Sequence, residues 1–300
     1  MFHAKDNLRG SLLMVFSMAG FAIEDMFIKW AAADLPPGQI LLFIGLAGGA
    51  VFALMAAAQG ASVWSARAFH PAVIGRNIGE MAGTYGFILA LARIDLSTLS
   101  AVVQAMPLFV TMGAALFLGE KVGWRRWTAI AVGFGGVLLV IRPGFGGFDA
   151  QALWAVLAVV GLGARDIFTR RVPAEISSVQ VSAWGFVAVA ALGAGMLAVS
   201  GGASVPTLPQ TGLLFGAVSF SIVAYWSLTA AMRLGEISAI TPFRYSRLIF
   251  ALIIGALVFG ERPDLITLTG AAVIIASGLY TFARERAVKQ RALSINASSR

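Results

Sequence analysis

Long apolar segments separated by short polar joints are the dominant pattern along this chain. Most segments are about 20 residues long, which is the length that an α-helix needs to span the hydrocarbon core of a bilayer. The joints contain helix breakers such as Pro36-Pro37 and Gly201-Gly202. The pattern predicts ten transmembrane helices, at residues 12–33, 39–58, 71–92, 97–118, 125–141, 150–170, 179–200, 212–232, 238–259 and 265–283.

The segment after the last predicted helix is polar. Because residues 284–300 contain few apolar side chains that could pack on a core, they predict a disordered tail. The joints between the predicted helices are too short for a soluble domain, so the whole fold is expected to be an all-α integral membrane protein.

The sequence repeats itself at an offset of 141 residues. Asp25 and Lys29 of the first predicted helix match Asp166 and Arg170 of the sixth, and the run 116–120 (LFLGE) matches the run 257–261 (LVFGE). These matches predict a duplicated five-helix unit, with one copy at residues 10–141 and the other at residues 150–283.

An odd number of helices in each unit decides the topology. Each copy must begin on the opposite side of the membrane from the other, so we expect inverted repeats related by a pseudo-two-fold axis in the membrane plane. This arrangement recurs among secondary transporters. An even total of ten helices also places both termini on one side.

The distribution of positive charge predicts which side that is. If the termini are cytoplasmic, the cytoplasmic joints and tails hold 14 lysines and arginines, whereas the outer joints hold three. Cytoplasmic loops carry the excess of Lys and Arg in most membrane proteins. The 14 are Lys5, Arg9, Arg67, Lys121, Arg125, Arg126, Arg170, Arg171, Arg233, Arg284, Arg286, Lys289, Arg291 and Arg300, and the three are Arg93, Arg142 and Arg262.

Composition supports a membrane protein and excludes several functional classes. The chain is 59% hydrophobic and 12% charged, with a mean hydropathy of +0.85, whereas soluble domains are about 25% charged. It has no cysteine and two histidines, His3 and His70, so we predict no metal site and no cofactor. The net charge is +8, and most of the positive side chains lie near helix ends. This placement favours contact with a lipid surface over binding of a nucleic acid. We expect a small-molecule substrate and no obligate protein partner.

Apart from Arg125, Arg126 and Arg170 at helix ends, nine charged residues fall within the predicted helices. An ionised side chain at the bilayer centre costs roughly 2.5–3.5 kcal/mol, so these groups must face one another or a wet cavity. Lys29 is close enough to a helix end to extend into the interface. The nine are Glu24, Asp25, Lys29, Arg76, Glu80, Arg165, Asp166, Arg244 and Arg247.

The third predicted helix carries a polar face. Arg76, Asn77 and Glu80 recur at helical spacing, and Arg76 and Glu80 are four residues apart, so they can pair along the helix. The pair could hold the helix against a neighbour, or it could form a substrate or proton site. Glu80 is the carboxyl nearest to the predicted midplane and is the candidate for proton coupling.

Arg244 and Arg247 share a face of the ninth predicted helix. The repeat places Val103 and Met106 at the matching positions of the fourth helix, so only one half is cationic there. The two arginines could pair with Glu80, anchor a carboxylate group of a substrate, or anchor the helix at the cytoplasmic surface.

Four further charges and several aromatic or amide side chains complete the candidate site. Glu24, Asp25, Arg165 and Asp166 could line an outer and an inner vestibule or take part in coupling, and they equally fit salt-bridge networks at helix ends. The residues expected to line a cavity, each of which also fits ordinary packing, are Tyr85, Gln104, Tyr225, Trp226 and Tyr245.

The duplicated Gly-Glu endings at Gly119-Glu120 and Gly260-Glu261, with Pro107 in the fourth helix, resemble the EamA-type domain of the drug/metabolite transporter superfamily. The resemblance covers residues 10–283. It implies ten helices with cytoplasmic termini in the bacterial inner membrane, and a central cavity among helices 1, 3, 4, 6, 8 and 9. It also implies export of amino acids, other metabolites or toxic compounds. Leu248 departs from the family pattern at the position that matches Pro107.

These observations predict an amino-acid exporter that works by alternating access, with no enzymatic activity. Arg247 or Arg76 would bind the substrate carboxylate, and Glu80 or Asp25 would meet its ammonium group. The alternatives are an exporter of lipophilic cations and, from another class, a membrane-embedded enzyme, which would need a catalytic His, Cys or carboxylate cluster.

Overall fold

The computed structural model describes residues 4–120, 122–143, 149–234 and 240–298. Outside these ranges lie His3, Lys121, Arg300 and the first two residues, 238–239, of the predicted ninth helix. The described residues form α1 (Ala4–Ala31), α2 (Pro37–Ala58), η1 (Ala66–Phe69), α3 (Pro71–Leu91), α4 (Leu96–Val103), α5 (Met106–Phe117), α6 (Trp124–Ile141), η2 (Ala150–Ala152), α7 (Leu153–Thr169), α8 (Ser178–Ser200), α9 (Leu208–Leu234), η3 (Thr241–Tyr245), α11 (Ser246–Val258) and α12 (Leu265–Ser298).

The predicted disordered tail is wrong over most of its length. Helix α12 continues beyond the expected membrane boundary and ends at Ser298. Its second half is rich in Ala, Arg, Lys and Gln, which are good helix formers although they are polar or small. A polar composition therefore indicated the end of the membrane span but not the end of the helix.

Two of the predicted continuous helices contain a break in the structure. The fourth segment divides into α4 and α5 at Gln104 and Ala105, just before Pro107. Proline has no N–H and disfavours a regular helix before it. In the second half, the matching segment begins as the 3₁₀ helix η3, which contains Pro242, and continues as α11.

Nine helical segments of the described chain are long and apolar enough to cross a membrane. Helix α3 is not one of them, although it has 21 residues, because Arg76, Asn77 and Glu80 interrupt its apolar sequence. Side chains such as Phe16, Leu46 and Leu54 are exposed on the outside of the bundle. An apolar exterior over so many helices suits contact with lipid.

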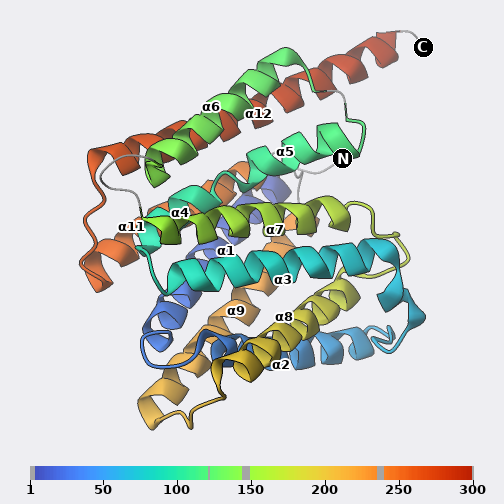
Figure 1. Cartoon of the computed structure of the whole chain (residues 1–300). Helices are drawn as coiled ribbons and strands as arrows, with labels where there is room; N and C mark the ends of the chain where they lie inside the picture. Colours follow the sequence, from blue (N-terminus) through green and yellow to red (C-terminus); the bar gives the residue numbers. More distant parts are fainter. Residues whose placement is uncertain (1–3, 121, 144–148, 235–239, 299–300) are drawn as a thin grey trace.

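The helices pack as four main pairs. Helix α1 packs against α9, α2 against α8, α3 against α7, and α6 against α12. Figure 1 shows α6 and α12 at one edge of the bundle and α2 with α8 at the other. Helix α1 begins, and α12 ends, at the same end of the bundle in that view.

Glycines bring α3 and α7 into close contact. A Cβ atom on Gly79 would lie 2.7 Å from the backbone nitrogen of Arg165, and one on Gly83 would lie 2.5 Å from that of Leu162. Such distances leave no room for a side chain, so only glycine permits this approach. The contact fixes the face of α3 that carries Glu80 against the face of α7 that carries Arg165.

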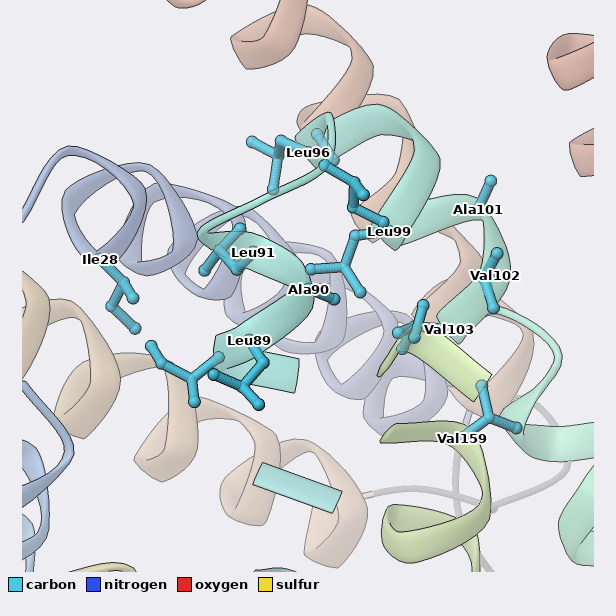
Figure 2. Packing of buried hydrophobic residues seen from close by; sticks show 14 of the residues in the cluster. Ile28, Leu89, Ala90, Leu91, Leu96, Leu99, Ala101, Val102, Val103 and Val159 are labelled. Carbon is cyan, nitrogen blue, oxygen red and sulfur yellow. The ribbon is translucent and has the colours of Figure 1, made fainter. Parts of the chain in front are cut away.

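The largest apolar core runs through most of the bundle and includes buried side chains of α1, α3, α4 and α7. Ile28, Leu91, Leu99 and Val159 belong to this cluster of buried side chains (Figure 2). It lies beside the polar residues described next and holds their helices in fixed relative positions.

Candidate substrate site

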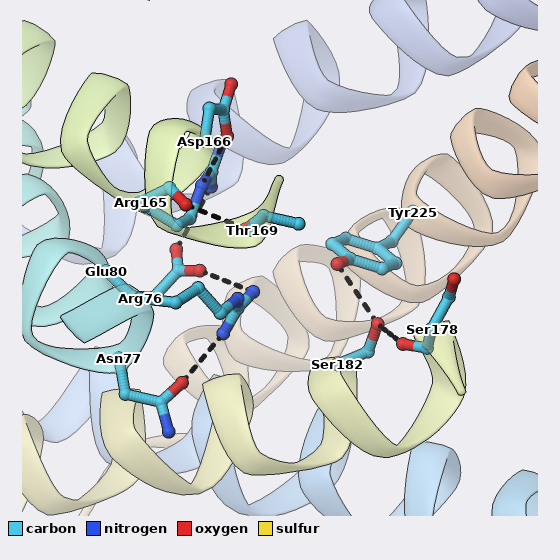
Figure 3. A network of polar contacts seen from close by, with 9 residues as sticks. All are labelled: Arg76, Asn77, Glu80, Arg165, Asp166, Thr169, Ser178, Ser182 and Tyr225. Atoms are coloured by element: carbon cyan, nitrogen blue, oxygen red, sulfur yellow. Dashed lines mark hydrogen bonds and ion pairs between the residues drawn. The ribbon is translucent and has the colours of Figure 1, made fainter. Parts of the chain in front are cut away.

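A row of alternating charges crosses the contact between α3 and α7. The Glu80 carboxylate pairs with Arg76 of its own helix at 2.9 Å and with Arg165 of α7 at 3.2 Å. Arg165 in turn donates to Asp166 at 2.8 Å, and Arg76 donates to Asn77 at 2.9 Å (Figure 3). The predicted pairing of Arg76 with Glu80 is confirmed, and the structure adds Arg165 as a second partner.

Helix α8 forms the other wall beside Arg76. The Arg76 guanidinium packs on Gly185, where a Cβ atom would lie 2.9 Å from the Cζ atom. On the far side of Arg76, Tyr225 of α9 accepts a hydrogen bond from Ser182 at 3.1 Å (Figure 3). The charged row thus joins α3 to α7 and packs on α8, and the separate Ser182–Tyr225 hydrogen bond joins α8 to α9.

A second ion pair joins α1 to α11. Arg247 donates to Asp25 at 2.7 Å, and its guanidinium lies 5.4 Å from the ring centres of Phe21 and Phe87. The predicted pairing of Arg247 with Glu80 is wrong. Asp25 takes that role because α1, rather than α3, packs along α11. Asp25 is also more buried than Glu80, with 2% of its side chain exposed against 13%.

Two further interior charges, Glu24 and Arg244, are not in ion pairs with any residue that the structure describes. Glu24 has Ser221 as a hydrogen-bond partner and lies near Asp25 and Arg247. Arg244 lies in η3, near Asp166, Arg165 and Arg247. Both side chains are half-buried.

The aromatic and amide candidates lie in several different surroundings. Tyr85 packs edge-on against Trp154, at 5.6 Å between ring centres, and Gln104 donates to the backbone oxygen of Tyr245 at 3.2 Å. The Tyr245 side chain is buried, whereas 53% of Trp226 is exposed. Trp226 therefore faces outward and is not brought together with the other candidates.

One group of polar residues at the end of the bundle that holds the α3–α4 joint was not predicted as a site. Glu261 accepts hydrogen bonds from the backbone of Leu96 at 2.7 Å and from the backbone of Ser97 at 2.9 Å, so it caps the start of α4. Lys29 lies 3.8 Å from Glu261 and donates to the Ile94 oxygen at 2.5 Å, so it turns inward instead of extending into the interface. Burial and the nearby Glu261 carboxylate raise the pKa of Asp95 above its ordinary value.

The repeat relates this group to an ion pair at the opposite end. Arg170 matches Lys29 and Glu120 matches Glu261 at the same offset of 141 residues, and these two side chains pair at 2.9 Å. Gly119 and Gly260, which precede the two glutamates, have φ angles of 69° and 66°, a region that favours glycine. The two pairs differ in burial, because Lys29 and Glu261 are 18% and 5% exposed, whereas Arg170 and Glu120 are 50% and 41% exposed.

The described residues form an all-helical bundle with nine helices long and apolar enough to cross a membrane, an apolar exterior and ion pairs between the helices, which is the architecture of a multi-pass membrane protein. The chain belongs to the EamA-like transporter family, whose model matches residues 8–142 and 150–283. The resemblance to the drug/metabolite transporter superfamily is thereby confirmed.

Several transporters are similar in sequence. A riboflavin transporter of Rhizobium johnstonii is 30% identical over 203 residues, which are 68% of this chain and 67% of the relative. An S-adenosylmethionine uptake transporter of Rickettsia bellii is 28% identical over 208 residues, 69% of each protein. A pseudopaline exporter of Pseudomonas aeruginosa is 26% identical over 269 residues, 89% of this chain and 94% of the relative.

A solved structure supports the fold. It covers 93% of this chain and 98% of its own, with a TM-score of 0.63 at 18% identity. Family and relatives together make this chain a multi-pass membrane protein of a transporter family, and its relatives are named for both uptake and export.

Proposed function

We propose that this protein is a secondary transporter that exports amino acids or related small zwitterions by alternating access. The observation that carries the proposal is the charge content of the bundle interior. Four acids, Glu24, Asp25, Glu80 and Asp166, accompany four arginines, Arg76, Arg165, Arg244 and Arg247, so the set is neutral as a whole.

A zwitterion is the kind of solute that such an interior accommodates at least cost. Its carboxylate binds an arginine and its ammonium group binds an acid, so no unpaired charge is left in the low-dielectric interior. A cation without a carboxylate would add a charge that this balanced set does not neutralise. Tyr85, Tyr225 and Tyr245 are the aromatic side chains proposed to face the rest of the substrate.

The proposed architecture is ten transmembrane helices in two inverted repeats, at residues 10–141 and 150–283, followed by a tail at 284–300. The pairing of helices supports it. Exchange of the two halves converts the α1–α9 pair into the α7–α3 pair, and leaves the α2–α8 and α6–α12 pairs unchanged. The matching ion pairs of Lys29 with Glu261 and Arg170 with Glu120 obey the same exchange.

We propose that the protein lies in the bacterial inner membrane with both termini in the cytoplasm. The excess of Lys and Arg at one end supports this orientation. It makes the Lys29–Glu261 pair periplasmic and the Arg170–Glu120 pair cytoplasmic.

The two pairs are proposed as the gates of alternating access. The buried Lys29–Glu261 pair closes the periplasmic end, whereas the exposed Arg170–Glu120 pair leaves the cytoplasmic end hydrated. On this basis the described conformation is the one that accepts substrate from the cytoplasm, as an exporter requires.

The names of the relatives suit this substrate class in part. S-adenosylmethionine contains an amino-acid group, and the pseudopaline exporter, which aligns with 89% of this chain, is named for outward transport. Riboflavin has no amino-acid group, so riboflavin is included among the compounds tested below.

Counterflow in proteoliposomes tests the proposal. Vesicles are loaded with one unlabelled compound, and entry of its labelled form is followed for neutral, aromatic, basic and acidic amino acids, for riboflavin and for a lipophilic cation. Exchange of amino acids supports the proposal. Exchange of the lipophilic cation or riboflavin alone would refute the amino-acid substrate class but still demonstrate transport. No exchange of any compound would contradict the proposal and favour the membrane-embedded enzyme.

A further inference from the structure

Arg244 differs from the other interior arginines in having no ion-pair partner among the residues that the structure describes. Arg76 pairs with Glu80, Arg165 pairs with Glu80 and Asp166, and Arg247 pairs with Asp25, all at 2.7–3.2 Å. Within the described ranges, Arg244 makes no hydrogen bond or ion pair. Its five N–H donors are therefore available to a bound molecule.

The surroundings of Arg244 favour an anion. The charged groups that act on it are Asp166, Arg165 and Arg247, two cations against one acid. Asp166 is already engaged, because both Nε and a terminal nitrogen of Arg165 lie 2.8 Å from its Oδ1 atom. A cation beside other cations in a low-dielectric interior is costly, and an entering carboxylate removes that cost.

The backbone that carries Arg244 is held in place. Residues 241–245 form η3, and Gln104, at the break between α4 and α5, donates to the backbone oxygen of Tyr245 at 3.2 Å. Arg244 thus extends from a segment that the other half of the molecule fixes. The matching residue of that half is Val103, which is buried in the apolar core, so the fold itself does not require an arginine at this position.

Glu24 is the acidic counterpart of Arg244. It is the interior acid without an ion pair in the described part of the chain, and its charged neighbours are Asp25 and Arg247. The interior therefore contains one unmatched cation, Arg244, and one unmatched anion, Glu24, with Arg247 close to both. The carboxylate of a zwitterion can pair with Arg244 and its ammonium group with Glu24.

We propose that Arg244 is the residue that binds the carboxylate of the transported molecule, and that Glu24 receives its ammonium group. This assignment rests on the proposed function. It differs from the expectation that Arg247 or Arg76 binds the carboxylate, because those arginines already have acid partners.

Kinetics of Arg244→Gln and Arg244→Lys test the assignment. For an amino acid that the wild type exchanges, Arg244→Gln is expected to raise KM about ten- to a hundredfold, because a hydrogen-bonded charge contact is lost, with a much smaller effect on kcat. Arg244→Lys is expected to recover part of the affinity. The decarboxylated amine of the same amino acid is expected to bind wild type and Arg244→Gln equally, and to lose affinity in Glu24→Gln.

Arg67→Gln is the matched control, because the Arg67 side chain is exposed and donates to the Glu175 backbone oxygen at 3.2 Å, away from the proposed site. Size-exclusion profiles and Tm values report whether each variant folds. An unchanged KM in Arg244→Gln, or an equal loss for the amine, would overturn the assignment.

A direct binding assay separates this inference from the proposed function. Wild type and Arg244→Gln are compared in detergent by thermal shift, with the amino acids and with carboxylates that lack an amino group. Suppose that amino acids are not exchanged, but that a carboxylate stabilises the wild type and not Arg244→Gln. The assignment of Arg244 as the carboxylate-binding residue is then supported, and the proposed substrate class is wrong. If no carboxylate stabilises the wild type, the assignment is refuted.

Discussion

At the scale of single residues, Glu80 is the group on which most contacts of the site depend. Its carboxylate forms ion pairs with Arg76 at 2.9 Å and with Arg165 at 3.2 Å, and 13% of its side chain is exposed. Removal of one partner from a buried ion pair leaves an uncompensated charge, which costs roughly 3–5 kcal/mol.

Glu80→Gln is therefore expected to destabilise the protein by about 3 kcal/mol and to abolish transport. The double variant Glu80→Gln/Arg76→Met removes one charge of each sign and leaves Arg165 paired with Asp166 at 2.8 Å. It is expected to recover most of the stability but no transport, measured by Tm in detergent and by counterflow. Recovery of both would mean that the pair has only a structural role.

Asp264 shows how a charge outside the membrane span stabilises a helix start. It accepts a hydrogen bond from the Thr267 N–H at 2.9 Å and pairs with Arg142. These contacts hold the pKa of Asp264 well below its usual range. Since the pKa is depressed in the folded state, the stabilisation is complete above the unfolded pKa and is lost as pH falls below it.

We expect Asp264→Ala to lower the stability by about 1 kcal/mol at pH 7, chiefly through loss of the helix cap. The exposed ion pair adds little. The Tm difference from wild type is expected to be constant from about pH 8 to pH 5 and to shrink below about pH 4. A difference that persists unchanged at pH 3 would show that the cap acts without its charge.

The sequence predicted which residues are charged in the interior better than it predicted their partners. Helical spacing was sufficient to predict the ion pair of Arg76 with Glu80, because both residues lie on one helix. The partner of Arg247 depends on which helices are neighbours, and that information is not contained in the sequence of either helix. Lys29 was misjudged for a related reason, since its carbonyl and Glu261 partners come from other elements.

At the scale of helices, glycines decide how closely the pairs approach. Gly83 of α3 faces Leu162 of α7 at a distance that leaves no space for a side chain. Gly135 of α6, in contrast, has open space where a Cβ atom would be. Both glycines lie in the middle of a helix, so substitutions at the two positions differ chiefly in the space around the new side chain.

Gly83→Leu is expected to separate α3 from α7, to lower Tm and to abolish transport, because overpacking costs roughly 1–3 kcal/mol or more. Gly135→Ala is expected to be neutral or to stabilise the protein by up to about 1 kcal/mol. Thermal unfolding in detergent and counterflow measure both effects. Equal behaviour of the two variants would argue against a special role for the α3–α7 contact.

Helix ends were less predictable than helix positions. The hydrophobic pattern located each span, but α12 continues through polar residues to Ser298 and the fourth segment is broken at Gln104. The first difference arises because helix formers need not be apolar. The second arises because Pro107 removes a backbone donor within an otherwise regular apolar run.

At the scale of the whole molecule, the two ends of the bundle carry related but unequal ion pairs. The Lys29–Glu261 pair is buried and caps α4 through Glu261, whereas the Arg170–Glu120 pair is exposed. This difference predicts which end admits a reagent from solution.

The absence of cysteine from the sequence makes the test direct. We expect Thr169→Cys, beside Arg170, to react rapidly with a maleimide, and Ser97→Cys, beside Glu261, to be protected, because Thr169 is exposed and Ser97 is buried. A transported substrate is expected to increase labelling of Ser97→Cys and to decrease labelling of Thr169→Cys. Parallel changes at both sites would contradict alternating access.

The balance of the interior charges also has an electrical consequence. A segment that moves a net charge through the membrane field gains or loses roughly 2.3 kcal/mol per charge for each 100 mV. In the proposed alternating-access cycle the interior charges return to their starting positions, so they carry no net charge across the membrane, and a zwitterion adds none. Transport of a zwitterion alone is thus expected to carry no steady current, so that any steady current recorded during transport belongs to a coupled ion.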